Sequence, residues 1–184
     1  MLPSDSAFHA AIFNALCSCL ELSSSSAEAS SLIRRAYQEP ENAPKPGRNQ
    51  NVIYYDIAED NSPDAGYQIF SEENPTSAGA FASVSSFLPY RLIVVCYGPA
   101  CVWNANRIRD FIFLDGAGYP RSILRKAGIY PVPRPPAPVL LHEEDGALWR
   151  RRADLVIQLR VTDTCARENR RPGIAEPPAV VMKT

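Results

Sequence analysis

The chain has 184 residues, a length that suits one domain with a single hydrophobic core. Hydrophobic residues make up 46% of it and charged residues 21%, a globular composition that excludes collagen, coiled coil and full disorder. Lys and Arg number 19 against 20 Asp and Glu, so charge gives no argument for a nucleic-acid or membrane-surface protein.

The near-neutral total conceals two halves of opposite charge. Residues 1–100 carry 5 basic and 11 acidic side chains, whereas residues 101–184 carry 14 and 9. Such a dipole along the sequence suits head-to-tail contact between identical copies, although folding can equally interleave the two halves.

Two helices are predicted within residues 1–38. Ser4 or Asp5 can cap the first, whose apolar residues recur at steps of four and three: Phe8, Ile12, Leu16, Cys19 and Leu20. The capping-box spacing of Ser25 and Glu28 predicts the start of the second, which should end near Tyr37. Its apolar stripe consists of Ala29, Leu32, Ile33 and Ala36.

Strands are expected to follow a Pro-rich loop or extended arm at residues 39–50. Val52–Ala58 is rich in β-branched and aromatic residues and predicts a strand, and Gly66–Phe70 is a candidate to pair with it. From Ser71 to Ser86 small and polar residues dominate, which predicts an exposed hairpin, a loop or a mobile flap. Tyr90–Tyr97 is almost wholly apolar, so we expect a strand in mid-sheet or buried on both faces.

A helical period returns after Gly98-Pro99 ends that strand. Residues 101–114 are predicted to turn Cys101, Ala105, Ile108, Phe111 and Ile112 inward, with Asn104, Arg107 and Asp110 mostly outward. Asp115-Gly116 should stop this helix, and residues 121–127 can form one or two further turns before Gly128. Residues 130–138, YPVPRPPAP, then predict an extended connector.

The C-terminal part reads as a β-hairpin. Val139–Glu143 and Leu148–Val161 flank the turn signal Asp145-Gly146. The second arm alternates cleanly and should bury one face: Ala153, Leu155, Ile157, Leu159 and Val161. Beyond it, residues 165–184 predict a tail, in which Ala179–Met182 can add a last short strand.

Together these elements predict one α+β domain over residues 1–184, with a mainly antiparallel β-sheet, helices packed on one face and extended loops or arms. The sheet and helix core should lie within residues 51–164. Asp5 and His9 precede any apolar turn, which is unlike a signal peptide, and no apolar run is long enough to span a bilayer. We therefore expect a soluble protein made in a cytoplasm.

Residues able to carry out chemistry are few. Only two histidines occur, His9 and His142, and neither has metal-ligand spacing. The cysteines include no C-x-x-C pair and are interpreted as reduced, packed thiols: Cys17, Cys19, Cys96, Cys101 and Cys165. His142-Glu143-Glu144 is interpreted as a solvated polar cluster, with acid and base roles as the alternative. Since no nucleophile elbow or phosphate-binding glycine pattern appears either, we expect no enzymatic activity, cofactor or metal.

The densest charge cluster opens the second hairpin arm. Arg150, Arg151 and Arg152 follow Trp149, and alternation along a strand puts only Arg150 and Arg152 on one face. Binding of phosphate, pairing with acids of a neighbouring subunit and charge gating of a sheet edge are three functional interpretations. The alternative is a solvated strand end.

The segment from Tyr90 to Val161 carries a family resemblance. It reads LPYRLIVVCYGPACVWNANRIRDFIF and then GYPRSILRKAGIYPVPRPPAPVLLHEEDGALWRRRADLVIQLRV. A strand ending in Y-G-P, a helix with N-A-N-R-I-R, a Pro-rich crossover and a final R-R-R-A-D-L-x-I-x-L-R-V strand resemble the neck or tail-terminator family of tailed bacteriophages. The match covers about 75 residues, and its motifs are structural.

The resemblance implies a virion structural protein that forms a ring, commonly a homohexamer, at the head-proximal end of the tail. Such a ring stops polymerisation of the tail tube protein and joins the tail to the head-tail connector or stopper protein, with a sheath as a further partner in contractile tails. DNA would pass through the lumen without sequence-specific binding, and no membrane is involved. Synthesis would take place in the host bacterial cytoplasm.

Contacts with a neighbouring subunit or partner are expected to use basic and aromatic side chains: Arg107, Arg109, Trp149, Arg150, Arg151, Arg152 and Arg160. Two alternatives remain open. One is a head-completion or stopper protein of the neck, and the other is a small cytosolic enzyme that uses Cys96 or His142.

Overall fold

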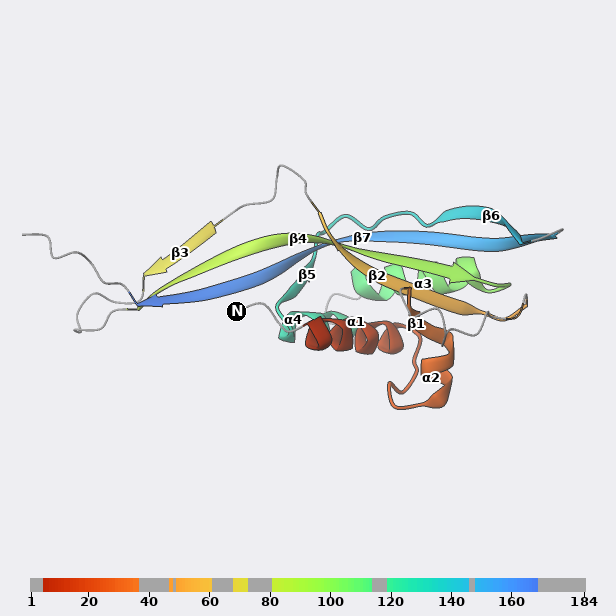
Figure 1. Cartoon of the computed structure of the whole chain (residues 1–184), viewed down its shortest axis with the longest axis horizontal. Helices are drawn as coiled ribbons and strands as arrows, with labels where there is room; N and C mark the ends of the chain where they lie inside the picture. The colour runs from red at the N-terminus through yellow and green to blue at the C-terminus, as the bar shows by residue number, and fades with distance from the viewer. Residues whose placement is uncertain are drawn as a thin grey trace, which may run out of the picture.

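The computed structural model describes residues 5–36, 47, 49–60, 68–72, 81–113, 119–145 and 148–168 (Figure 1). Its helices are α1 (Asp5–Cys19), α2 (Ala27–Leu32), α3 (Cys101–Phe113) and α4 (Tyr119–Lys126). Its strands are β1 (Ile33–Arg35), β2 (Val52–Glu59), β3 (Gln68–Glu72), β4 (Phe81–Tyr97), β5 (Ile129–Pro131), β6 (Val139–Asp145) and β7 (Leu148–Glu168).

All the described strands belong to one sheet. The central order is β1-β2-β4-β7-β5, β3 pairs with β4, and β6 pairs with β7. Every pairing is antiparallel except the parallel contact between β1 and β2. The predicted α+β fold with a mainly antiparallel sheet is therefore confirmed.

The two longest strands form the axis of the molecule. β4 pairs with β7 from Phe81↔Glu168 to Tyr97↔Arg152. Figure 1 shows the helices under one half of this pair, while the other half extends past them as a ribbon with β3. We call this extension, residues 68–72, 81–89 and 160–168, the arm.

The core lies between the sheet and the helices. The predicted alternation in β7 is confirmed, since Ala153, Leu155, Ile157, Leu159 and Val161 are all buried. Opposite them, β4 contributes Leu92, Val94 and Cys96. The apolar stripes of α1 and α3 cover the same face, so the prediction of helices packed on one face is also confirmed.

Prediction of the second helix was wrong at both ends. The cap is Ser26 and not Ser25, because the Ser26 Oγ accepts a hydrogen bond from the Ala29 N–H at 3.1 Å. The helix ends at Leu32, and Ile33 adopts extended backbone and pairs with Ile53. The buried Ile33 thus continues an apolar stripe while belonging to a strand, because pairing with β2 overrides the local helical pattern.

Pairing of Gly66–Phe70 with Val52–Ala58 was also wrong. β3 pairs instead with β4, from Gln68↔Ser86 to Glu72↔Ala82. β4 continues past the end of β2, where Glu59 pairs with Tyr90, and this leaves an edge for β3. The hairpin alternative for residues 71–86 is confirmed, because Ser71 pairs with Ser83 and Glu72 with Ala82. Residues 73–80 lie outside the described ranges.

Of two further burial predictions, the mid-sheet alternative for Tyr90–Tyr97 is confirmed and the outward direction of Asn104 is wrong. Tyr90–Tyr97 lies in mid-sheet, but Arg91 is exposed and Ile93 and Val95 are only half-buried, so one face alone is fully buried. Asn104 was predicted to point outward and is 4% exposed. It is buried because it stands three residues after Cys101, on the stripe that packs inward.

Most of the remaining elements follow prediction, but β7 was predicted to end at Val161 and instead runs into the predicted tail. α3 and α4 form, Gly128 ends α4 with φ +73°, and β6 and β7 form the hairpin. Residues 39–46 and 48 of the predicted loop lie outside the described part, as do Asp115-Gly116, Gly146 and residues 169–184 of the tail. Within the tail's first residues, β7 continues to Glu168.

Candidate assembly surface

The sheet face away from the helices is uncovered over much of its area within the described chain. Cross-strand register places Tyr54, Val95, Asp154 and Val139 side by side on this face. Neighbouring rows add further side chains: Asp56, Ile93 and Val156, then Tyr97, Arg152 and Leu141. We call this surface the open face.

Apolar side chains on the open face reach solvent. Val139 is 56% exposed, Val156 43% and Leu141 40%. Exposed apolar side chains grouped on one sheet face are typical of surfaces that contact a partner. The open face therefore has the character of an interface.

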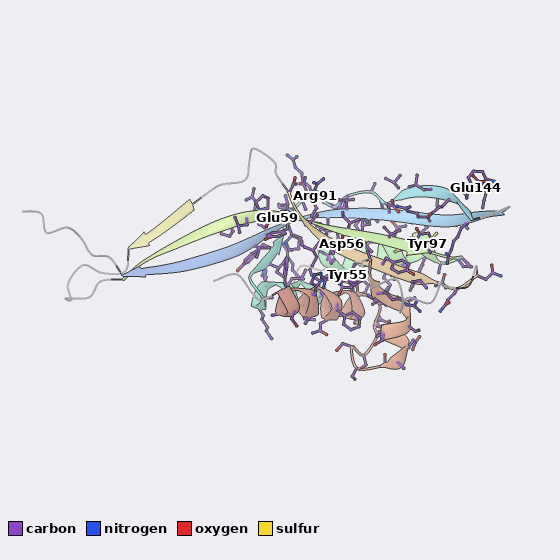
Figure 2. All side chains as sticks on the ribbon, viewed as in Figure 1. Tyr55, Asp56, Glu59, Arg91, Tyr97 and Glu144 are labelled. Atoms are coloured by element: carbon purple, nitrogen blue, oxygen red, sulfur yellow. The ribbon has the colours of Figure 1, made fainter. Side chains whose placement is uncertain are left out.

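A polar cluster stands at the end of the open face that Figure 2 marks with Tyr97. The Tyr97 hydroxyl donates to Glu143 Oε2 at 2.6 Å. The Arg152 guanidinium donates to both carboxylate oxygens of Asp154, at 2.6 and 2.7 Å, and lies 3.4 Å from Glu143. The Arg150 guanidinium lies over the Tyr97 ring, 4.7 Å from its centroid. These five residues form the Tyr97 cluster.

Electrostatics fix the protonation states in the Tyr97 cluster. Burial, followed by the bond to Glu143, raises the pKa of Tyr97 to about 12. The Tyr97 hydroxyl and the Arg152 guanidinium lower the pKa of Glu143, and the bonds to Asp154 raise the pKa of Arg152. At neutral pH the phenol of Tyr97 is therefore neutral, the Glu143 carboxylate is ionised and the Arg152 guanidinium is charged.

The prediction that Arg150 and Arg152 share a face is confirmed, because both contact the Tyr97 ring. Arg152 pairs with acids of its own chain, so those contacts need no neighbouring subunit. Arg151 is exposed and pairs across the hairpin with His142. Trp149 is 68% exposed near the hairpin tip.

Three other predicted interface residues lie elsewhere. Arg107 on α3 donates to the Cys19 carbonyl at 2.8 Å and pairs with Glu21 at 2.6 Å, which joins α3 to the end of α1. Arg109 pairs with its neighbour Asp110. Arg160 lies on the same side of β7 as Arg152 and Val156 but farther along the strand, at the base of the arm. The seven residues therefore do not form one surface.

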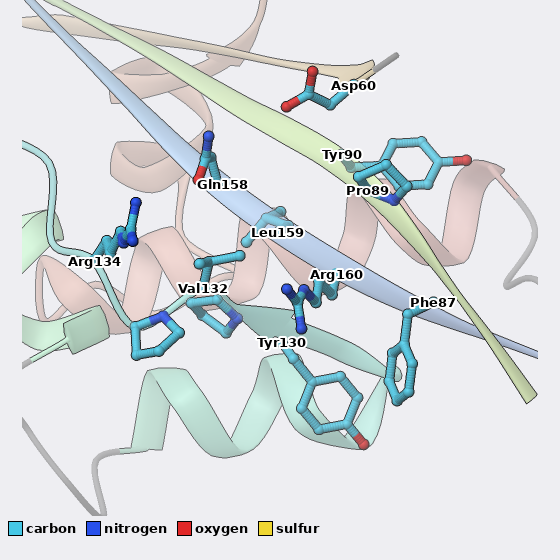
Figure 3. A pocket seen from close by; sticks show the side chains of 12 residues that line it. Asp60, Phe87, Pro89, Tyr90, Tyr130, Val132, Arg134, Gln158, Leu159 and Arg160 are labelled. Carbon is cyan, nitrogen blue, oxygen red and sulfur yellow. The ribbon is translucent and has the colours of Figure 1, made fainter. Parts of the chain in front are cut away.

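Sequence reasoning missed a groove at the base of the arm. It has a volume of about 630 Å³ and is lined by Asp60, Phe87, Pro89, Tyr90, Tyr130, Pro131, Val132, Pro133, Arg134, Gln158, Leu159 and Arg160 (Figure 3). We call it the neck groove. The only signal in the sequence is the density of prolines and aromatics in the connector, which does not indicate what lies opposite.

The walls of the neck groove combine aromatic rings with two cations that pair with no residue of the described ranges. The Phe87 and Tyr130 rings meet edge to face with centroids 6.4 Å apart. Neither Arg134 nor Arg160 has an ion pair or side-chain hydrogen bond with any residue that the structure describes. Asp60, which also lines the groove, lies 3.6 Å from Arg91.

The described thiols are packing groups. Cys17, Cys19, Cys96 and Cys101 are free and buried. Burial raises the pKa of Cys19 and of Cys96 to about 12, so both stay protonated at neutral pH. Among residues with described positions, no group of three His, Cys, Asp or Glu side chains could hold a metal ion.

No protein family model matches the sequence, and no curated protein matches it. Of the helices in the described ranges, none combines the length and apolar character required to cross a membrane.

Proposed function

We propose that this chain is a ring-forming tail terminator of a tailed bacteriophage, which ends polymerisation of the tail tube protein and joins the tail to the head connector. The observation that carries the proposal is the open face, with Val139, Leu141 and Val156 exposed beside the Tyr97 cluster. A surface of this kind serves contact between proteins. The resemblance of Tyr90–Val161 to the terminator family supplies the kind of assembly.

Ring closure follows from one repeated contact. When one surface of a subunit binds a different surface of the next, the rotation between subunits either closes a ring or generates a filament. A terminator needs closure, with one ring face that accepts the tube and another that admits no further tube layer. The open face and the arm, which extends past the helices, offer two distinct surfaces for such contacts.

Electron microscopy and native mass spectrometry of the full-length protein, and of particles that contain it, test the proposal. We expect rings, and Val156→Glu should abolish them because it introduces a charge into the open face. Trp103→Glu is the matched control, since Trp103 is 57% exposed on α3, away from that face. A strictly monomeric protein, without rings even in particles, would contradict the proposal.

Deletion of the gene separates the terminator from the neck stopper. A terminator deletion should give overlong tails, because nothing ends tube growth. Tails of normal length that fail to join heads would contradict the terminator assignment and support a stopper.

A further inference from the structure

The tip of the β6–β7 hairpin presents an aromatic ring and a carboxylate that the described chain leaves without partners. Trp149 and Glu144 face each other in the strand register. Trp149 is 68% exposed, more than any other large hydrophobic side chain that the structure describes. Glu144 is exposed and forms no ion pair with a described residue, and Figure 2 shows it at the end of the sheet opposite the arm.

The neck groove presents the complementary groups. Arg134 comes from the connector after β5 and Arg160 from β7, and neither has an acidic partner among the residues that the structure describes, whereas Phe87 and Tyr130 form an aromatic wall beside them. A guanidinium pairs well with a carboxylate, and an indole packs well against other aromatic rings. One acid and one large ring thus meet two cations and two rings, and the acid that also lines the groove, Asp60, pairs with Arg91.

We propose that the hairpin tip of one copy docks in the neck groove of the next copy. Glu144 then binds Arg134 and Arg160, and Trp149 packs against Phe87 and Tyr130. This inference rests on the proposed function and names the contact that joins neighbouring subunits of the ring.

Geometry favours a second copy of the chain as the occupant. The tip and the groove lie in different parts of the same molecule, at the end of the sheet and at the base of the arm. One contact between them is heterologous and leaves a free tip and a free groove at the two ends of a chain of copies. Only ring closure satisfies every tip and every groove at once. Large exposed Trp side chains and Arg are the groups that dominate such interfaces.

Prolines also suit the groove to binding. Pro89, Pro131 and Pro133 fix the backbone of its walls, so little conformational entropy is lost when a ligand enters. The groove is therefore formed in the isolated subunit before any partner binds.

A charge swap in the full-length protein tests this contact. Glu144→Arg and Arg160→Glu should each raise the concentration needed for ring formation by roughly tenfold or more, because each opposes like charges. The double variant should restore ring formation, and Trp149→Ala should weaken it without affecting folding. Glu28→Arg is the control, since Glu28 is an exposed acid on α2, away from both surfaces. Native mass spectrometry measures the rings, and thermal denaturation checks that each variant folds.

Each outcome decides the inference. Loss in both single variants and recovery in the double variant support it. If rings form in the wild type but the single variants do not differ from it, or the double variant fails to recover, this contact is wrong while the ring function stands. If the wild type forms no ring alone or in particles, the proposed function and this contact both fail.

Discussion

Gly98 offers the sharpest test of the structure, because its replacement by Ala combines backbone strain with collision. Gly98 follows β4 and has φ +97°, a conformation that L side chains rarely adopt. An added Cβ would lie 2.6 Å from Asn51 Oδ1 and 2.7 Å from the Gln50 carbonyl oxygen. Asn51 Oδ1 already accepts a hydrogen bond from the Ala100 N–H at 2.9 Å, next to the start of α3.

The expected cost of Gly98→Ala has two parts. Backbone strain at a positive φ costs about 1–3 kcal/mol. Displacement of Asn51 weakens its bond to Ala100, which adds about 1 kcal/mol, before any cost of moving the Gln50 backbone. The total of about 2–4 kcal/mol is a large part of the roughly 5–15 kcal/mol that stabilises a typical domain.

Gly128→Ala is the matched control. Gly128 also has a positive φ, +73°, but its added Cβ would lie 3.8 Å from the nearest atom, the Thr162 carbonyl oxygen. Gly128→Ala should therefore lower the free energy of unfolding through backbone strain alone, by about 1–2 kcal/mol. Urea denaturation followed by circular dichroism measures both variants. If Gly98→Ala is no more destabilising than Gly128→Ala, the close packing around Gly98 is refuted.

Four further predictions concern the core and the Tyr97 cluster. Tyr97→Phe should lower the free energy of unfolding by about 1 kcal/mol through loss of the bond to Glu143, and a double-mutant cycle with Glu143→Ala, which removes the acceptor, should show that the effect vanishes. Folding lowers the pKa of Glu143, so the stability that Glu143 contributes above its unfolded pKa of about 4.3 should be lost as pH falls through the folded value. Folding raises the pKa of Tyr97, so the stability that Tyr97 contributes should be lost as pH rises from about 10 toward 12. Urea midpoints measured across pH, compared with those of Glu143→Gln, test the acid side. Cys19 and Cys96 should resist a thiol-specific reagent at pH 8 until denaturant is added, since burial keeps both protonated, and reaction in the native state would show that they are accessible. Leu155→Ala should cost about 2–5 kcal/mol in urea denaturation, because Leu155 is fully buried, and a cost below 1 kcal/mol would place it outside the core.

Periodicity made much of the fold predictable. Alternation over Ala153–Val161 and the helical stripes of α1 and α3 reflect one buried face, and the burial of those side chains confirms it. Local turn chemistry was equally direct at Gly98 and Gly128. These patterns are properties of neighbouring residues, so the sequence displays them without reference to the rest of the chain.

Strand pairing was less predictable. Ile33 continues a helical stripe in sequence, yet it pairs with Ile53, and β3 pairs with β4 because β2 ends too soon. The local pattern of apolar residues fits helix and strand equally well at Ile33, and it fits β2 and β4 equally well as partners of β3. The decision depends on which edges are free once the whole sheet has formed.

Local patterns of residues were enough to predict the class of the fold, the buried face of each long element and the shared face of Arg150 and Arg152. Only the tertiary structure brought Tyr97 to Glu143, 46 residues away along the chain, and set Arg134 and Arg160 around one groove. Periodicity reports which way a side chain points within its own element. Contacts between elements depend instead on strand register and on packing across the whole domain, which no local pattern encodes.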